Sequence, residues 1–316
     1  MQLIILDNIM CNYAPIVVFT YCRAKNTRET IESLLVNQEA GSSDIIIFSD
    51  AAKNEKAIKA VSETRDYIHS VSGFKSIRIV EREQNYGLAK NIIQGVTEII
   101  NQYGKAIILE DDMTVSPFFL KYMNDGLERY KDNKEVASIH GYMYPSSSVL
   151  SLPETFFIKG ADCWGWATWK RAWDVFSPDA KFLYDEIKKR GLVKKFEFDY
   201  SYPYYKMLKG QMLGKENSWA ICWYASCFLN DMYTLYPNQS MILLNGLDGV
   251  GSTHGEGDNQ SCYLTIIKDT PITMFPDNGE IKESKEGVDS FKNFFLKNLS
   301  LKGKIAYLLR FIHIRL

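Results

Sequence analysis

Three adjacent carboxylates, Glu110, Asp111 and Asp112, directly follow the apolar segment 105–109. Like charges packed this closely raise one another's pKa unless a cation lies nearby. Carboxylate oxygens are the ligands that Mg²⁺ and Mn²⁺ prefer, and such ions commonly carry the phosphates of a substrate. The triplet therefore predicts a metal site that holds a nucleotide diphosphate, with a solvated acidic turn as the alternative.

Polar residues also stand at the ends of two earlier apolar segments. Thr20 and Arg23 close the segment 15–21, and Asp50 ends the segment 44–50. An arginine in this position can contact a base or a phosphate. A carboxylate can accept a hydrogen bond from the imide N–H of uracil or from a ribose hydroxyl. The alternative for each is an ordinary surface charge.

A third polar cluster lies in the segment 85–91, where a loop opens a predicted helix. A glycine lets another molecule approach the backbone closely, and the N-terminus of a helix is a favourable place for phosphates. The alternative is a simple cap of the helix. The residues expected to contact the nucleotide here are Asn85, Gly87, Leu88, Lys90 and Asn91.

The elements that must position these clusters alternate along the first half of the chain. Short apolar, β-branched runs predict buried strands, and apolar residues at helical spacing separate them. This rhythm predicts a mixed, mostly parallel sheet flanked by helices, an α/β fold in which ligands bind beyond the carboxyl ends of the strands. The predicted strands are 15–21, 44–50, 76–83 and 105–112, and the helices between them include 54–70 and 88–102.

Composition excludes several classes of protein. The 37 basic and 38 acidic residues give a net charge of -1, which argues against a nucleic-acid binder. No apolar run is long enough for a transmembrane helix. The six cysteines form no CxxC pair, so a zinc ribbon is not expected, and buried reduced thiols favour a cytoplasmic protein. The first fifteen residues lack the basic start of a signal peptide.

The order of the motifs resembles the GT-A (Rossmann-like) fold glycosyltransferases over about residues 14–256. The resemblance is closest to the N-acetylglucosaminyltransferase I type and to bacterial family-2-like sugar transferases of polysaccharide assembly. It is carried by FTYCRAKNTRETIESLL, IIIFSDAA, NYGLAKNI and AIILEDDMTVSPFFLKYM, and further along by GWATWKRAWD, SWAICWYA, LYP and NGLDGVGSTH.

The resemblance implies a metal-dependent inverting glycosyltransferase that uses a UDP-sugar and Mn²⁺ or Mg²⁺. The implied acceptor is a hydroxyl of a glycan or of a lipid-linked saccharide in surface polysaccharide assembly. By the same resemblance Asp112, the last carboxylate of the triplet, binds the metal, and Glu110 and Asp111 face the ribose and the donor sugar. Asp50 and Arg23 then correspond to the uridine pocket.

The general base is the point at which this chain departs from the resembled family. The eukaryotic enzyme has a Trp-Asp-Asp-Trp segment, whereas SWAICW has Ala220 in the place of the acid. Glu216 is the first candidate for the base, followed by Asp162 and Asp248. The missing acid also supports an alternative, a non-catalytic subunit that binds a nucleotide-sugar or a glycan. A nucleotidyltransferase is less favoured. That class of enzyme prefers a glycine-rich loop directly after the first strand, and the segment TYCRAKN in that position contains no glycine.

Two further features carry alternatives of comparable weight. His254, in a glycine-rich loop, is expected to bind the metal or the diphosphate, or else to pack beneath the loop. Trp164, Trp166 and Trp169 are expected to form a platform for a sugar, with Trp166 toward the donor. Tryptophans at this density also occur in protein cores.

The chain is expected to divide into two halves of one GT-A domain and a tail. Residues 1–115 are predicted to bind the nucleotide-sugar and residues 116–274 the acceptor, with a linker and a tail in 275–316. The segment 290–316 is basic and amphipathic, which suits the inner face of the plasma membrane. A C-terminal helix that packs on the sheet is the alternative.

Overall fold

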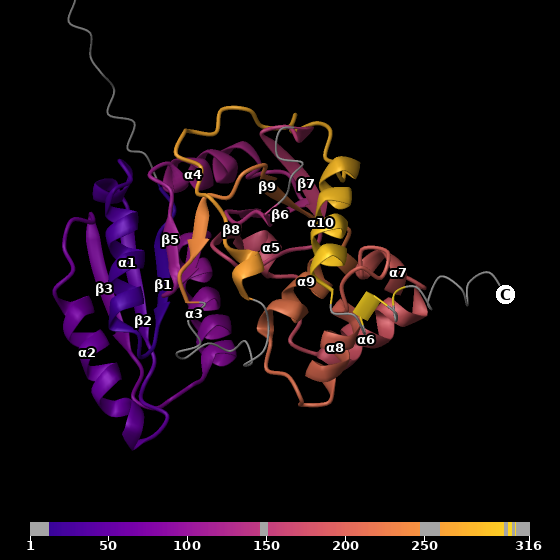
Figure 1. Ribbon diagram of the computed structural model, residues 1–316. Coiled ribbons are helices and arrows are strands. Elements are labelled where there is room, and N and C mark those ends of the chain that lie inside the picture. Colours follow the sequence, from indigo (N-terminus) through magenta and orange to yellow (C-terminus); the bar gives the residue numbers. More distant parts are fainter. Residues whose placement is uncertain (1–12, 146–150, 247–259, 300–302, 305–306, 308–316) are drawn as a thin grey trace, which may run out of the picture.

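The computed structural model describes residues 13–145, 151–246, 260–299, 303–304 and 307. Within these ranges the centre of the molecule is an eight-stranded sheet in the order β3-β2-β1-β4-β8-β6-β9-β7 (Figure 1). The strands of the N-terminal half lie on one side of Figure 1, and the helices of the second half lie on the other. The predicted mixed, mostly parallel sheet flanked by helices is confirmed.

The first four strands are parallel and carry the predicted apolar runs. β1 pairs with β2 on one side and with β4 on the other, so the strand order reverses direction between β1 and β4. In open α/β sheets this reversal opens a crevice at the carboxyl ends of the strands. The strands are β1 (Ile16–Thr20), β2 (Asp44–Ser49), β3 (Ser76–Glu81) and β4 (Lys105–Glu110).

The second half extends the same sheet beyond β4. β8 runs antiparallel to both of its neighbours, β4 and β6, and β7 runs antiparallel to β9. β8 was not predicted as a strand, because its four residues stand inside a tryptophan-rich stretch without a clear alternation. The strands are β6 (Val136–His140), β7 (Thr155–Lys159), β8 (Trp166–Trp169) and β9 (Tyr233–Pro237).

Helices cover both faces of the sheet. Alternate residues of β1 point to opposite faces, so Val18 packs in one core with α1 and α4, and Phe19 packs in the other with α3 and α5. Strands buried on both faces are typical of sheets of this class. The helices are α1 (Ala24–Leu35), α2 (Ile58–His69), α3 (Leu88–Tyr103), α4 (Phe119–Arg129) and α5 (Lys170–Trp173).

The predicted helical region 180–213 consists of three separate helices that pack around a buried fourth. They are α6 (Ala180–Lys189), α7 (Val193–Phe196) and α8 (Tyr204–Met212), and they surround α9 (Trp219–Leu229). Short 3-10 turns stand at Ala40–Ser42, Glu55–Ala57 and Gln260–Tyr263.

A separate two-stranded ribbon joins the two halves at the end of β4. β5 (Met113–Val115) follows the acidic triplet directly and pairs antiparallel with β10 (Ile242–Leu244), so Leu244 lies opposite Met113. The orange strand beside β5 in Figure 1 shows this late segment in the middle of the molecule. The ribbon therefore brings the residues after Leu244 to the acidic turn.

The C-terminal segment agrees with the packed-helix alternative as far as it is described. α10 (Lys285–Asn298) buries Phe291, Phe294 and Phe295, and their rings contact Tyr144. Ser284, in the predicted linker, donates its backbone N–H to the carbonyl of Phe157. Most of the remaining tail lies outside the described residues. Among the helices that are described, none combines the length and the apolar character needed to cross a membrane.

Candidate functional site

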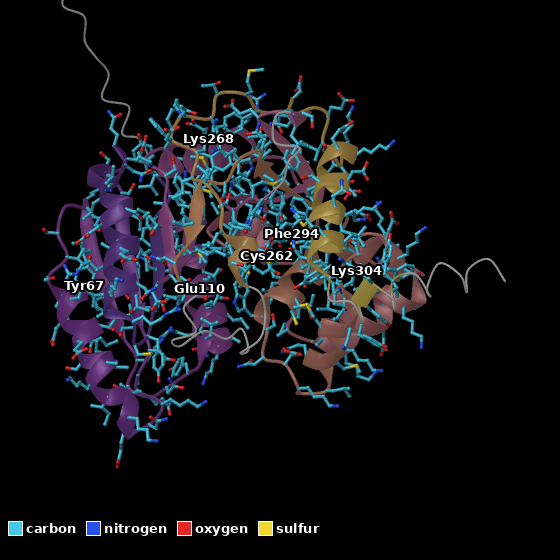
Figure 2. All side chains as sticks on the ribbon, viewed as in Figure 1. Tyr67, Glu110, Cys262, Lys268, Phe294 and Lys304 are labelled. Carbon is cyan, nitrogen blue, oxygen red and sulfur yellow. The ribbon has the colours of Figure 1, made fainter. Side chains whose placement is uncertain are left out.

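The acidic triplet lies at the carboxyl end of β4, next to the end of β1. Glu110 is the last residue of β4 and stands beside Phe19, one residue before β1 ends. Figure 2 labels Glu110 near the middle of the view, between the N-terminal strands and the helices of the second half. The switch in strand order therefore places the three carboxylates where an open α/β sheet binds its ligands.

Arg23 pairs with two of the three carboxylates through one nitrogen. Its Nη2 donates to Oδ1 of Asp111 and lies 3.0 Å from Oδ2 of Asp112. Asp111 also accepts the backbone N–H of Tyr21 at 3.3 Å, and its side chain is only 4% exposed, against 24% for Asp112. Asp112 is therefore the carboxylate of this pair that faces outward, as its predicted role as a metal ligand requires.

The turn carries more negative charge than Arg23 balances. Burial, together with the charges of Asp112 and Asp111, raises the pKa of Glu110 to about 8 against the opposing effect of Arg23. Burial likewise raises the pKa of Asp111 to about 6, although Arg23 opposes the shift. A protonated acid at neutral pH marks a place where an added cation would be stabilised.

Residues 245–246, directly after β10, pack on this turn. The sequence predicts Asp248 and His254 of the same glycine-rich loop as site residues, but not these two. Asn245 donates its backbone N–H to the carbonyl of Asp112 at 2.9 Å. A Cβ atom on Gly246 would lie 2.3 Å from Oδ2 of Asp112 and 2.8 Å from Nη1 of Arg23. Only glycine fits here. The glycine-rich segment NGLDGVG indicated a special loop here, but the sequence did not show that Gly246 lies against Asp112 and Arg23.

These residues fit a divalent metal that is shared with a substrate. The donor set consists of carboxylate oxygens, which suit Mg²⁺ or Mn²⁺ rather than a softer ion. Within the described ranges, no group of three or more His, Cys, Asp or Glu side chains is arranged to hold a metal by itself. Mg²⁺ is typically bound through one or two carboxylates together with substrate phosphates, and the outward carboxylate of Asp112 matches that pattern.

Asp50 is used differently from its predicted role as a direct nucleotide contact. Its Oδ1 accepts the backbone N–H groups of Ala51 and Tyr86, and its Oδ2 accepts the Asn85 amide and the Gly87 N–H, at 2.8 to 3.0 Å. A carboxylate has about four acceptor positions. All four are therefore occupied, so Asp50 holds the loop 85–87 and presents no free oxygen to a uracil or a ribose.

The rest of the segment 85–91 is split between an open loop and buried support. Gly87 has a positive φ of 71°, and no atom lies within 4 Å of where its Cβ would stand, so its backbone is open to a ligand. Asn91 is 3% exposed, and its side-chain oxygen accepts a hydrogen bond from Arg82. The prediction that Asn91 contacts the nucleotide is therefore wrong. Lys90 lies over the ring of Tyr86.

Two further residues predicted to contact the nucleotide-sugar, Thr20 and Leu88, stand at the end of β1 and the start of α3. Thr20 is buried at the end of β1, and its hydroxyl donates to the carbonyl of Phe48 at 3.5 Å. Leu88 is the half-buried first residue of α3 and packs against the α3 side of the core. Both therefore support the edge of the sheet.

Asp162 lies at the same edge as the triplet. Its Oδ1 accepts the backbone N–H of Cys163, and its Oδ2 lies 3.3 Å from the hydroxyls of Tyr144 and Tyr236, both of which donate to it. Burial raises the pKa of the Cys163 thiol, and the charges of Asp162, Glu110 and Asp112 raise it further. Trp166, four residues after Asp162, pairs with Ile108 of β4, two residues before Glu110, so the segment that holds Asp162 runs to the edge that carries the acidic turn.

Glu216, the first candidate for the base, is exposed in the loop between α8 and α9. Its side chain lies against Gly210 of α8. Asp248 and His254 lie outside the described residues. The chain leaves Gly246 beside Asp112 and then continues toward both of them.

Trp166 is a core residue, contrary to the prediction that it faces a sugar. Its ring is 1% exposed and packs among Trp173, Trp219 and Trp223, at centroid distances of 5.6 to 5.7 Å. Trp169 is also buried, and its indole N–H donates to a backbone carbonyl of α4. Neither residue has a free ring face for a platform.

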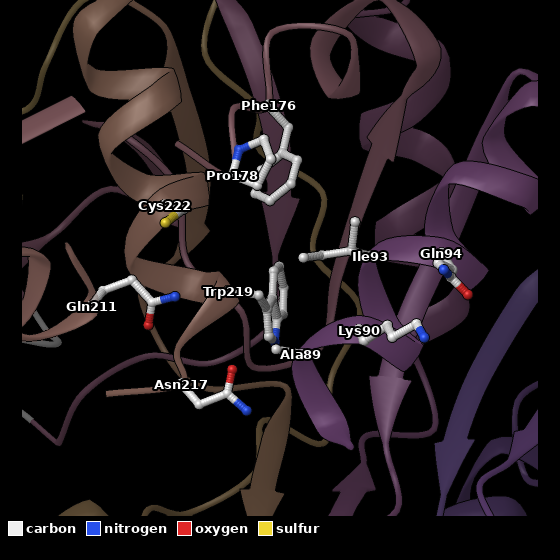
Figure 3. Close-up of a pocket in the computed structure, with 10 residues that line it drawn as sticks. All are labelled: Ala89, Lys90, Ile93, Gln94, Phe176, Pro178, Gln211, Asn217, Trp219 and Cys222. Atoms are coloured by element: carbon white, nitrogen blue, oxygen red, sulfur yellow. The ribbon is translucent and has the colours of Figure 1, made fainter. Parts of the chain in front are cut away.

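A cavity of about 310 Å³ opens between α3 and the α8–α9 loop. Figure 3 shows Trp219 at its centre, with Asn217 and Gln211 on one side and Lys90 on the other. Lys90 lines this cavity, and its ammonium lies over the ring of Tyr86. The cavity lies between the start of α3, at Ala89 and Lys90, and α9, at Trp219 and Cys222.

Comparison with known families gives a match over the first half of the chain. The GNT-I family model matches residues 6–178, which is more than half of the 316 residues. The matched region contains β1 to β8 and the whole acidic turn. No curated protein matches the chain.

Several solved structures are similar over part of their length. A mannosyltransferase from Pyrobaculum calidifontis, solved with GDP-Man and Mn²⁺, is 12% identical, covers 43% of this chain and 37% of its own, and gives a TM-score of 0.30. Residues 1–349 of S. aureus TarS are 10% identical. The match covers 64% of the present chain and 71% of the TarS fragment, with a TM-score of 0.36.

A third structure is glucosyl-3-phosphoglycerate synthase from Mycobacterium tuberculosis, solved with Mn²⁺, UDP and phosphoglyceric acid. It is 11% identical. The match covers 64% of the present chain and 78% of the synthase, with a TM-score of 0.33. The present chain thus spans well under half of the mannosyltransferase and 24% of the longer TarS chain.

Proposed function

The chain belongs to the GNT-I family of glycosyltransferases, and from that premise we propose that it transfers a sugar from a UDP-sugar to a hydroxyl of a saccharide acceptor. The observation that carries the proposal is the position of Asp112. It is an outward carboxylate beside Arg23, in the crevice where the strand order reverses. A divalent ion and a diphosphate find complementary charges there.

The residues around the turn have distinct roles in this proposal. Asp112 would hold Mn²⁺ or Mg²⁺, which as a Lewis acid offsets the negative charge on the departing diphosphate. Arg23 supplies positive charge for the diphosphate, and the open backbone of Gly87 admits the nucleotide. Asp50 keeps the loop 85–87 in place through three of its four accepted hydrogen bonds.

Asp162 is the general base in this proposal, in place of Glu216. The thiol of Cys163 senses Asp162 together with Glu110 and Asp112, whereas the exposed Glu216 is attached to a separate loop. Two tyrosine hydroxyls fix the carboxylate, and its side chain is 17% exposed, so an acceptor hydroxyl can reach it. A base that acts on the side opposite the leaving group gives inversion.

The wider setting follows from the sequence resemblance and from the tail. We place the enzyme in surface polysaccharide assembly, with a glycan or lipid-linked acceptor bound by residues 116–274. The basic residues of 290–316 would then contact the inner face of the plasma membrane. The buried phenylalanines of α10 limit that contact to the face of the tail that is not packed on the domain.

The test is release of UDP from a panel of UDP-sugars, with saccharide acceptors, in the presence and absence of Mn²⁺. Release that requires Mn²⁺ and an acceptor, and that Asp112→Asn abolishes, supports the proposal. Asp125→Asn on the exposed face of α4 is the matched control. Tight UDP-sugar binding without release from any donor would instead support the non-catalytic alternative that Ala220 suggests.

A further inference from the structure

The contacts of Arg23 point to a coupling between nucleotide and metal binding. We propose that Arg23 is a displaceable counter-ion of Asp112. In the nucleotide-free protein its guanidinium occupies the carboxylate that the metal needs, and the diphosphate of the nucleotide draws it away. This inference rests on the proposed function, because it takes Asp112 as the metal ligand.

The first observation is that Arg23 and a metal ion would compete for the same oxygen. Nη2 of Arg23 lies 3.0 Å from Oδ2 of Asp112, which belongs to the only outward side chain of the Asp111–Asp112 pair. A guanidinium and a divalent cation repel each other at this range. Each of them therefore weakens the binding of the other at Asp112.

The second observation is a buried donor on the other side of the guanidinium. Nη1 of Arg23 is enclosed and has no hydrogen-bond partner among the described residues. A buried donor without an acceptor is costly, so this nitrogen favours any ligand that brings one. Phosphate oxygens suit an arginine fork because they accept two parallel hydrogen bonds. Gly246 packs directly against this nitrogen, since a Cβ there would lie 2.8 Å from Nη1, so Nη1 gains a phosphate partner only when the guanidinium turns.

The third observation is that Arg23 has a second anchor that it can keep. Asp111 is buried, accepts from Nη2 of Arg23, and is held in place by the backbone N–H of Tyr21. A small rotation of the guanidinium toward a phosphate can release Asp112 and retain Asp111. The movement needs no change in the fold, and the charge on Asp111 stays paired throughout.

The experiment measures Mn²⁺ binding to the purified protein without nucleotide, by the electron paramagnetic resonance signal of free Mn²⁺. We expect Arg23→Met to bind Mn²⁺ about tenfold more tightly than the native protein, since an opposite charge at this distance shifts ionic equilibria by that order. Arg78→Met removes an arginine that pairs with the exposed Glu98, and it should leave Mn²⁺ affinity unchanged. Asp112→Asn should bind no Mn²⁺ in either background.

The outcomes separate this inference from the proposed function. If native protein binds Mn²⁺ only weakly even with UDP, and Asp112→Asn makes no difference, the proposed function itself fails. If Mn²⁺ binds at Asp112 but Arg23→Met is no tighter than native, Arg23 is not a counter-ion of the metal site and the inference is wrong.

A second measurement uses the native protein, so it does not depend on whether Arg23→Met folds. Crystals soaked with UDP and a chelator should show Arg23 on the diphosphate and its contact with Asp112 broken. UDP bound with the Arg23–Asp112 contact intact would overturn the inference. Absence of UDP binding without metal would overturn it as well.

Discussion

The backbone N–H of Asn245 donates to the backbone carbonyl of Asp112 over 2.9 Å. This bond attaches a segment from the end of the second half directly to the acidic turn of the first. Because Gly246 follows at once, the position of the outward carboxylate depends on a residue far along the chain. The predictions below begin from that dependence.

Gly246→Ala should damage the site without unfolding the protein. The added Cβ would stand 2.3 Å from Oδ2 of Asp112, so the carboxylate must move. A displacement of about 1 Å at a reacting centre commonly costs about a hundredfold in rate. Steady-state kinetics of UDP release checks this, with Gly279→Ala as the control, because that Cβ meets nothing closer than 3.6 Å. Full activity of Gly246→Ala would contradict the packing described here.

Asp50→Asn should weaken both the fold and UDP binding. The amide nitrogen would face backbone N–H groups of the loop 85–87, which have no other acceptor there. An unmade buried hydrogen bond costs about 1–3 kcal/mol, so the free energy of unfolding in urea should fall by that amount. Calorimetric titration should show weaker UDP binding. If stability falls and UDP affinity stays native, the loop is not part of the nucleotide site.

Asp162→Asn and Glu216→Gln distinguish the two described candidates for the general base. Loss of a general base lowers the rate by about 10²–10⁴-fold, so Asp162→Asn should show that loss with UDP binding retained. Glu216→Gln should retain native kcat. The reverse pattern would restore Glu216 as the base, and native activity in both would move the role to a residue such as Asp248.

His140→Phe should remove part of the acid sensitivity of the fold. Burial lowers the pKa of His140 from 6.5 to about 4, and the nearby Asp162 opposes the shift only in part. Between these two values the unfolded chain binds the proton and the folded protein does not, so stability falls as the pH falls from 6.5 to 4. The shift corresponds to about 3 kcal/mol.

Urea unfolding at pH 7 and pH 4 measures this effect. The native protein should lose more stability between the two pH values than His140→Phe does. His69→Gln, which replaces an exposed histidine, should behave like the native protein. Equal losses in native protein and His140→Phe would mean that His140 does not carry this dependence.

Local signals were enough to predict the first half of the fold. β1, β2, β3 and β4 are buried apolar runs, and α3 has apolar residues at helical spacing, so each element carries its own pattern. The acidic triplet is visible because three carboxylates at a strand end are chemically unusual. Its place beside Arg23 follows from parallel strands that end at one edge.

The parts that sequence reasoning missed depend on contacts between distant segments. Nothing in the sequence near Asp50 shows that the loop 85–87 fills three of its acceptor positions. Trp166 is aromatic beside a glycine, which fits a sugar platform and a core equally well until its neighbours are known. Gly246 is constrained by Asp112, and only the pairing of β5 with β10 brings them together.

The order of the strands has a consequence for anyone who wishes to engineer acceptor preference. β8 lies between β4 and β6, so the sheet is one continuous hydrogen-bonded surface rather than two exchangeable modules. A chimera joined after β5 would leave β4 with a foreign partner along its whole edge. Grafting individual loops onto the intact scaffold, beginning with the one around Asp162, is the route that this topology permits.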